Sequence, residues 1–181
     1  MIWVIIILIA VVILVPVFWW IRTSNGFKRM EIRICESLSG IEVALTKRYD
    51  MLTKLLDVAK GYKQHETELF SEVIKLRKGM NVSELNNEAA KMDHLASNLN
   101  LVAEAYPELR SSDVFKELQA GIRDAEEHLQ AARRLYNSNV TAFNTATRIF
   151  PSSIVAKSQN AAEREFFVTK ENKRSDVAMM F

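Results

Sequence analysis

The sequence has few of the residues that interrupt helices. It contains five Gly and three Pro among 181 residues. A sheet protein needs many turns, and these two residue types build most of them. The scarcity therefore favours an all-α fold, and the length suits one modest domain rather than two.

Cysteine and histidine are also scarce, which argues against disulfide bonds and metal sites. Cys35 has no second thiol with which to form an intramolecular disulfide or share a zinc ion. The three histidines are His65, His94 and His128, and none has the preceding Glu of a Glu-x-x-His di-iron motif. Leu69 stands where the H-E-x-x-H zinc motif requires its second His. We therefore expect no metal and no cofactor.

Neither sign of charge dominates. The chain has 24 Lys and Arg against 22 Asp and Glu, and both signs are interspersed along it. A nucleic-acid partner would call for a basic patch, so none is expected. The sequence shows no Gly-rich phosphate loop, no nucleophile elbow and no nucleophile set beside a base. It therefore predicts a protein without enzymatic activity.

A long apolar run occupies the N-terminus. Ile2 to Ile21 form 20 consecutive uncharged and almost wholly apolar residues, and a helix of that length reaches about 30 Å, the thickness of a bilayer core. A cleaved signal peptide would need a basic start and a small-residue cleavage site, which are missing. Trp19 and Trp20 match an interfacial aromatic belt. We predict a retained transmembrane anchor over residues 1–22, with the lipid bilayer as its partner.

The charges that flank this run predict its orientation. No Lys or Arg precedes it, whereas Arg22, Lys28, Arg29 and Arg33 follow closely. Basic flanks stay on the cytoplasmic side. The prediction is a single-pass membrane protein with its N-terminus outside and its body in the cytoplasm.

The remainder is predicted to be helical. After a short polar linker over 23–26, apolar residues recur at steps of three and four through a body spanning 27–170, followed by a loosely ordered tail over 171–181. Such steps predict an antiparallel bundle of three long helices plus a short C-terminal helical segment.

Capping signals place the helix boundaries. The first body helix continues its apolar stripe to Leu76, and Asn81 with Glu84 form a capping box that begins the second. Pro107 ends that helix at the preceding residue. Ser111 or Ser112 caps the third, and Pro151 stops it. The short segment begins at Ser152.

Five clusters along the body resemble successive signatures of the LemA family. They are Arg48-Tyr49-Asp50, Lys60-Gly61-Tyr62 with His65-Glu66, Glu104 to Leu109, Arg133 to Asn137 with Val140, and Phe143-Asn144 with Phe150-Pro151. The resemblance covers Ile41 to Ala156. It implies one N-terminal transmembrane helix and a helical bundle at the bacterial cell membrane, and it implies no established enzymatic role.

The motif residues are predicted to have a structural or an interaction role. They are Arg48, Tyr49, Asp50, Tyr62, His65, Glu66, Glu104, Tyr106, Pro107, Glu126, Arg133, Tyr136, Asn137, Asn144, Phe150 and Pro151. Polar residues on helix seams usually fix register and partner orientation. In a functional interpretation they line a groove for a peptide or small anion, with arginines as clamps. We predict an interaction scaffold with protein partners still to be identified; the alternative is a membrane-tethered module that binds or transforms a small ligand.

The apolar stripe near the membrane needs a cover. The second helix is shorter than the first, so antiparallel pairing through a tight loop at Gly79 covers only the distal part of the first. The uncovered stripe comprises Leu45, Ile41, Leu38 and Ile34. Either the chain after Pro151 folds back over it, or another copy or membrane protein covers it. We favour fold-back, through Ile154, Val155, Phe166 and Phe167.

Overall fold

The fold is all-helical, as predicted. A computed structural model describes residues 2–61, 76 and 79–167, which form five helices and no strand. Tyr62, His65 and Glu66, and the tail over 171–181, lie outside the described residues.

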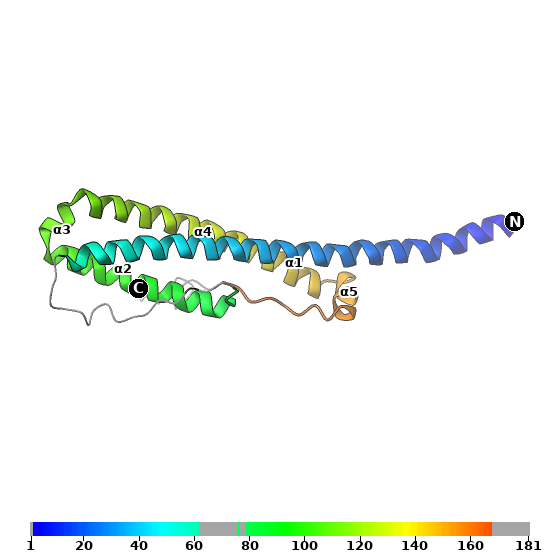
Figure 1. Ribbon diagram of the computed structural model, residues 1–181. Coiled ribbons are helices and arrows are strands. Elements are labelled where there is room, and N and C mark those ends of the chain that lie inside the picture. The colour runs from blue at the N-terminus through cyan, green and yellow to red at the C-terminus, as the bar shows by residue number, and fades with distance from the viewer. Residues whose placement is uncertain (1, 62–75, 77–78, 168–181) are drawn as a thin grey trace, which may run out of the picture.

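Helix α1, Ile2–Lys60, runs the length of the molecule (Figure 1). Its first 20 residues are apolar and, apart from the half-buried Trp19, exposed, and it is the one helix in the described chain that is long and apolar enough to cross a membrane. The polar segment 23–26 continues this helix instead of separating two helices. Packing accounts for the difference, because part of this segment is half-buried, and tertiary contacts override weak helix propensity.

Helix α2, Val82–Ala105, begins and ends where the sequence predicts. The Asn81 side chain accepts a hydrogen bond from the Glu84 backbone N–H at 2.8 Å, and the Glu84 carboxylate accepts one from the Asn81 N–H at 2.9 Å. Tyr106 is the C-terminal cap. The capping box is confirmed.

Three further helices complete the chain. Pro107 opens a single-turn helix, α3, Pro107–Ser111, which the sequence did not reveal. Ser112 caps α4, Asp113–Arg148, and the predicted stop before Pro151 is confirmed. The predicted short segment is α5, Ser152–Ser158.

The core lies mainly between α1 and α4, which run antiparallel. Phe27 and Phe143 pack edge to face near the apolar run of α1, with ring centroids 5.8 Å apart. At the other end Gly121 lets α4 approach Met51, because an added Cβ would lie 3.1 Å from the Met51 sulfur. The contacts therefore extend along most of the body.

Helix α2 runs in the same direction as α1, which differs from the expected antiparallel pairing of these two helices (Figure 1). Leu85, near the start of α2, lies with Leu76 beside residues 42–50 of α1. Asn100, near its end, accepts a hydrogen bond from Gln119 at the start of α4. A hydrophobic stripe specifies which face a helix buries, and it carries no information on direction.

The expected fold-back is confirmed. Ile41 and Leu45 are fully buried and Ile34 is nearly so, although α2 does not reach them all. Val155 and Phe167 are buried against the same cluster. Ile154 and Phe166, which were expected to help, remain about half exposed.

Candidate functional site

Arg48 is the centre of an ionic cluster that joins three helices. Its side chain is buried, and one terminal nitrogen lies 2.8 Å from a carboxylate oxygen of Asp93 on α2. The other lies 3.2 Å from a carboxylate oxygen of Glu126 on α4. We call Arg48, Asp93, Glu126 and Arg133 the seam cluster. A single arginine of α1 thereby fixes the register of both partner helices.

Arg133 completes the seam cluster. Its guanidinium is 3.9 Å from the other carboxylate oxygen of Glu126 and 5.0 Å from the ring centre of Phe167. Burial lowers the pKa of Arg133, whereas the charges of Glu126 and Asp93 raise it. Arginine keeps its charge in proteins, so two cations face two carboxylates and the formal charges cancel.

Several buried polar atoms of this cluster make no hydrogen bond with the residues that the structure describes. They are Nε and Nη1 of Arg48, Nε of Arg133 and Oε2 of Glu126. The contact between Arg48 Nη1 and Glu126 Oε2 is thus an ion pair by distance, without hydrogen-bond geometry. Each arginine already faces a carboxylate of the chain, so the cluster is better suited to fixing helix register than to clamping a free anion.

Tyr49 and Asp50 lie away from the seam cluster. They line an open hollow of about 670 Å³ between α1 and the start of α2. The other described residues that line it are Glu42, Val43, Thr46, Lys47, Leu76 and Leu85. Lys47 already pairs with Asp124, and the hydrogen bond from Lys47 lowers the pKa of that carboxyl group. Among the charged side chains that the structure describes in this lining, Lys47 is therefore already engaged by α4.

A second set of motif residues holds an extended segment, residues 161–167, which we call the strap. The strap follows α5 and returns along the bundle (Figure 1, orange). The Asn144 side chain donates to the Arg164 carbonyl at 2.9 Å and accepts from the Arg164 N–H at 2.8 Å. Asn137 makes the same pair of hydrogen bonds with the backbone of Phe167, at 2.9 and 2.8 Å.

The spacing of these two asparagines matches the strap. They are seven residues apart on α4, about 10.5 Å along a helix. Arg164 and Phe167 are three residues apart, about 10 Å along an extended chain. One helix face and one extended backbone therefore share a repeat, and each asparagine meets one strap residue.

Side-chain contacts add to this backbone recognition. The Tyr136 hydroxyl donates to the Glu165 carbonyl at 3.0 Å, and burial raises the pKa of Tyr136. Arg148 and Glu163 form a two-point ion pair at 2.6 and 2.5 Å. Arg164 reaches Glu31 of α1 at 2.7 Å. The strap is thus attached to both α1 and α4.

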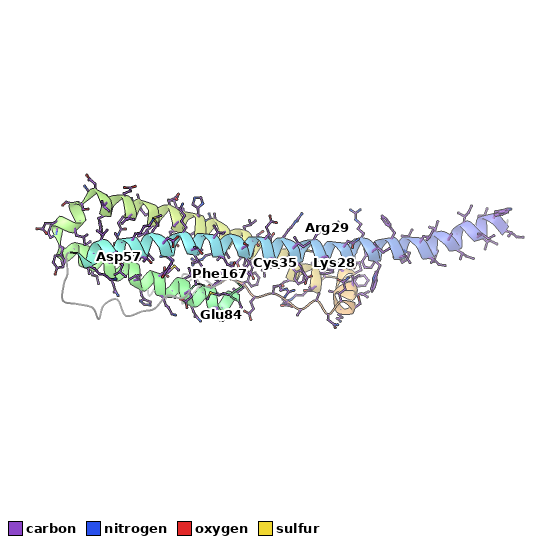
Figure 2. The ribbon with its side chains drawn as sticks, in the orientation of Figure 1. Lys28, Arg29, Cys35, Asp57, Glu84 and Phe167 are labelled. Atoms are coloured by element: carbon purple, nitrogen blue, oxygen red, sulfur yellow. The ribbon has the colours of Figure 1, made fainter. Side chains whose placement is uncertain are left out.

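Phe167 is the apolar anchor of the described strap (Figure 2). Its side chain is 1% exposed, and the guanidinium of Arg133 lies over its ring. Arg133 therefore belongs to the seam cluster and also covers the strap. The structure brings together Arg48, Glu126 and Arg133, and next to them Tyr136, Asn137 and Asn144.

The other motif residues lie at the two ends of the body. Glu104 lies in the last turn of α2, and Tyr106 and Pro107 lead from it into α3. Phe150 and Pro151 form the corner between α4 and α5. In the described part of the chain, no group of three or more His, Cys, Asp or Glu side chains is arranged to hold a metal ion.

Sequence reasoning missed Asp93, Glu163 and Arg164. Asp93 is one polar residue among many on a helix, with nothing in the sequence to pair it with Arg48. The strap has no periodicity of its own. The sequence did offer one signal for the strap, which is the pair of asparagines seven residues apart beside an apolar stripe. A side-chain amide has both a donor and an acceptor, so an asparagine without a side-chain partner can hydrogen-bond to a passing backbone segment.

The comparison with known families settles the relationship of the chain. The sequence model of the LemA family matches residues 37–181, well over half of the chain. The chain belongs to the LemA family. It is also 26% identical over 165 residues to Protein LemA of Metamycoplasma hominis (strain ATCC 23114 / DSM 25592 / NBRC 14850 / NCTC 10111 / PG21), covering 88% of this chain and 75% of that protein. The LemA match includes both the seam cluster and the strap.

Proposed function

We propose that this chain is a membrane-anchored scaffold without enzymatic activity, which holds partner proteins near the cytoplasmic face of the cell membrane. The observation that carries the proposal is the continuity of α1. The same helix supplies the apolar run and the central element of the bundle, without a flexible joint between them. The body is thus a rigid extension of the anchor rather than a domain on a tether.

The length of α1 sets the reach of this scaffold. The 20 residues from Ile2 to Ile21 account for about 30 Å, which matches a bilayer core. The 39 residues from Arg22 to Lys60 add about 58 Å. An upright helix would hold the α2–α3 turn on the order of 60 Å from the hydrocarbon, where it is accessible to cytoplasmic proteins.

Basic residues support the cytoplasmic placement. Arg22, Lys28 and Arg29 are exposed on α1 immediately after the apolar run. Such residues favour the cytoplasmic side during insertion and the anionic lipids found there.

The polar clusters support a scaffold over a ligand-binding module. In the described residues, the arginines of the seam cluster face carboxylates of the chain, and both strap asparagines are occupied by backbone. The large apolar side chains that the body instead exposes include Val43, Leu101, Val114 and Leu135. Exposed apolar residues of this kind add contact area to protein interfaces.

The test places a photo-crosslinking amino acid at each of these four positions in the full chain, in living cells. A scaffold gives an adduct of discrete mass at one position or more. The matched control carries the probe at Glu127, which is exposed and charged. The absence of an adduct at all four positions, together with thermal stabilisation of the full chain by a small metabolite, would contradict the proposal and favour the ligand-binding module.

Anchoring is tested separately by alkaline carbonate extraction. The full chain is expected to stay in the membrane pellet, as a spanning helix does. Release into the supernatant would show that the apolar run does not span the bilayer.

A further inference from the structure

The corner between α4 and α5 exposes an unusual group of apolar side chains. We call residues 149–154 the elbow. Ile149 is 55% exposed, Phe150 76% and Ile154 49%, while the neighbouring Val155 and Ala156 are buried in the core. Three large apolar side chains on one short corner are costly to leave in water.

The elbow lies beside the point where α1 leaves its apolar run. α5 packs against α1, and Gln159, at the end of α5, donates a hydrogen bond to the Ser24 hydroxyl. Ser24 is three residues beyond Ile21, about 4.5 Å along a helix. Phe143 of α4 contacts Phe27, and the chain continues from there toward the anchor into the elbow.

This position falls within the headgroup layer of a bilayer. The hydrocarbon core is about 30 Å thick and the whole bilayer about 40–45 Å, which leaves roughly 5–7 Å of headgroups on each side. With Ile21 at the edge of the hydrocarbon, Ser24 and the α5 helix bound to it lie inside that layer. Aromatic and apolar side chains at this depth bury their surface among lipids.

We propose that the elbow inserts into the membrane interface and gives the protein a second contact with the bilayer. The proposal rests on the anchoring proposed above. Its ligand is the phospholipid surface, with Phe150 as the inserted side chain. Basic residues nearby favour anionic headgroups: Lys28 and Arg29 (Figure 2) and Arg22 on α1, and Lys157 on α5.

A second copy of the chain fits the elbow less well. A specific protein interface buries on the order of 1,000 Å² or more, and three side chains on one corner supply much less. The adjacent exposed apolar surface is the anchor itself, which is in lipid. The lipid surface is therefore the occupant that covers elbow and anchor together.

Two attachment points have a consequence for the scaffold. A single helix is free to tilt and to rotate about its axis in the bilayer. Contact at the elbow fixes which face of α1 lies toward the membrane, and so fixes the direction in which α2 and α3 project. The elbow thereby orients the body.

The test measures depth with the full chain in nanodiscs of phosphatidylcholine and phosphatidylglycerol. Cys35→Ser removes the exposed native thiol, and the polarity-sensitive fluorophore NBD is attached to Phe150→Cys. The matched control carries NBD on Ser111→Cys, an exposed position on α3 at the far end of the body. We expect blue-shifted emission and several-fold stronger quenching by headgroup-level spin-labelled lipid at position 150 than at position 111.

A second pair of probes separates this proposal from the anchoring. NBD on Ile9→Cys, inside the apolar run, is expected to be quenched by lipid labelled deep in the acyl chain. Quenching at position 9 but not at position 150 overturns the proposed insertion of the elbow and leaves the proposed anchoring intact. Quenching at neither position overturns both. Blue-shifted emission at 150 without quenching shows a protein contact instead of lipid and also overturns the elbow.

Insertion is distinguished from mere proximity by Phe150→Asp, with NBD on Ile154→Cys. Phe150 is largely exposed, so this change leaves the core intact. If Phe150 inserts, the aspartate variant loses the lipid quenching at position 154. Unchanged quenching at position 154 shows an elbow that lies near the membrane without entering it and overturns the proposal.

Discussion

Asn137 holds Phe167 by both ends of its side-chain amide, donating to the carbonyl and accepting from the N–H of the same residue. Asn144 repeats this with Arg164. Two LemA motif residues thereby recognise backbone and do not depend on the side chains of the strap. The strap in turn covers the part of the α1–α4 core that α2 does not reach.

Replacing Asn137 with Ala is expected to loosen the end of the strap. Two hydrogen bonds are lost, each worth about 0.5–1.5 kcal/mol net, so local opening becomes easier by about 1–3 kcal/mol. Amide hydrogen exchange at Phe167 is expected to accelerate about tenfold to a hundredfold. Asn144→Ala is expected to have the same effect at Arg164.

The matched control is Ser138→Ala, on the exposed face of α4 next to Asn137. It is expected to leave exchange at Phe167 unchanged. Equal rates in the Asn137 and Ser138 variants would mean that the asparagine does not fasten the strap in solution.

Acid is expected to weaken the attachment of the strap at Glu163. The hydrogen bond from Arg148 holds the pKa of this carboxyl group below its usual value of 4.5. The folded state therefore binds the proton less readily than the unfolded state. The contribution of the pair is fully present above about pH 4.5 and is lost as the pH falls through the lowered pKa. Salt is expected to weaken it as well, because both groups are exposed.

Hydrogen exchange of the strap amides, compared between the wild type and Glu163→Gln, measures this effect. The two proteins are expected to differ above pH 4.5 and to converge as the pH falls through the lowered pKa of Glu163. The comparison is needed because Asp124, paired with Lys47, also has a lowered pKa and titrates with the same sign. A constant difference across the whole range would show that Glu163 acts without its charge.

The helix boundaries of this chain could be predicted from its sequence, whereas the packing of the helices against one another could be predicted only in part. Asn81 with Glu84, and Pro107, specify helix ends through contacts within a few residues. The fold-back could be predicted because the apolar stripe of the first helix was longer than the second helix could cover. The direction of α2 and the Arg48–Asp93 pair depend on contacts between distant segments, for which one sequence holds no signal.

Glu126→Ala is expected to destabilise the bundle more than an ordinary surface substitution. The change leaves Arg48 and Arg133 buried with only Asp93 to balance them. Removing one partner of a buried ion pair costs about 3–5 kcal/mol, and partial exposure of Glu126 reduces this to about 2–3. Urea unfolding of the full chain in detergent measures the difference.

The matched control for this change is Glu127→Ala, the exposed neighbour on α4, which is expected to stay within about 0.5 kcal/mol of the wild type. Replacing Glu126 with Leu and both arginines with Met is expected to recover most of the loss, because packed apolar groups substitute well for buried ion pairs. If Glu126→Ala and Glu127→Ala unfold alike, the cluster has no part in stability.

Cys35 reports which side of the membrane the body occupies. It is exposed on α1 beyond the basic flank (Figure 2), so protection from a reagent cannot be attributed to burial. A membrane-impermeant maleimide is expected to label Cys35 only after lysis, because basic flanks stay in the cytoplasm. The paired reporter is Ile2→Cys in a Cys35→Ser background, which is expected to react in intact cells. Labelling of Cys35 before lysis, with protection of position 2, would reverse the orientation and place the scaffold and its partners in the cell envelope.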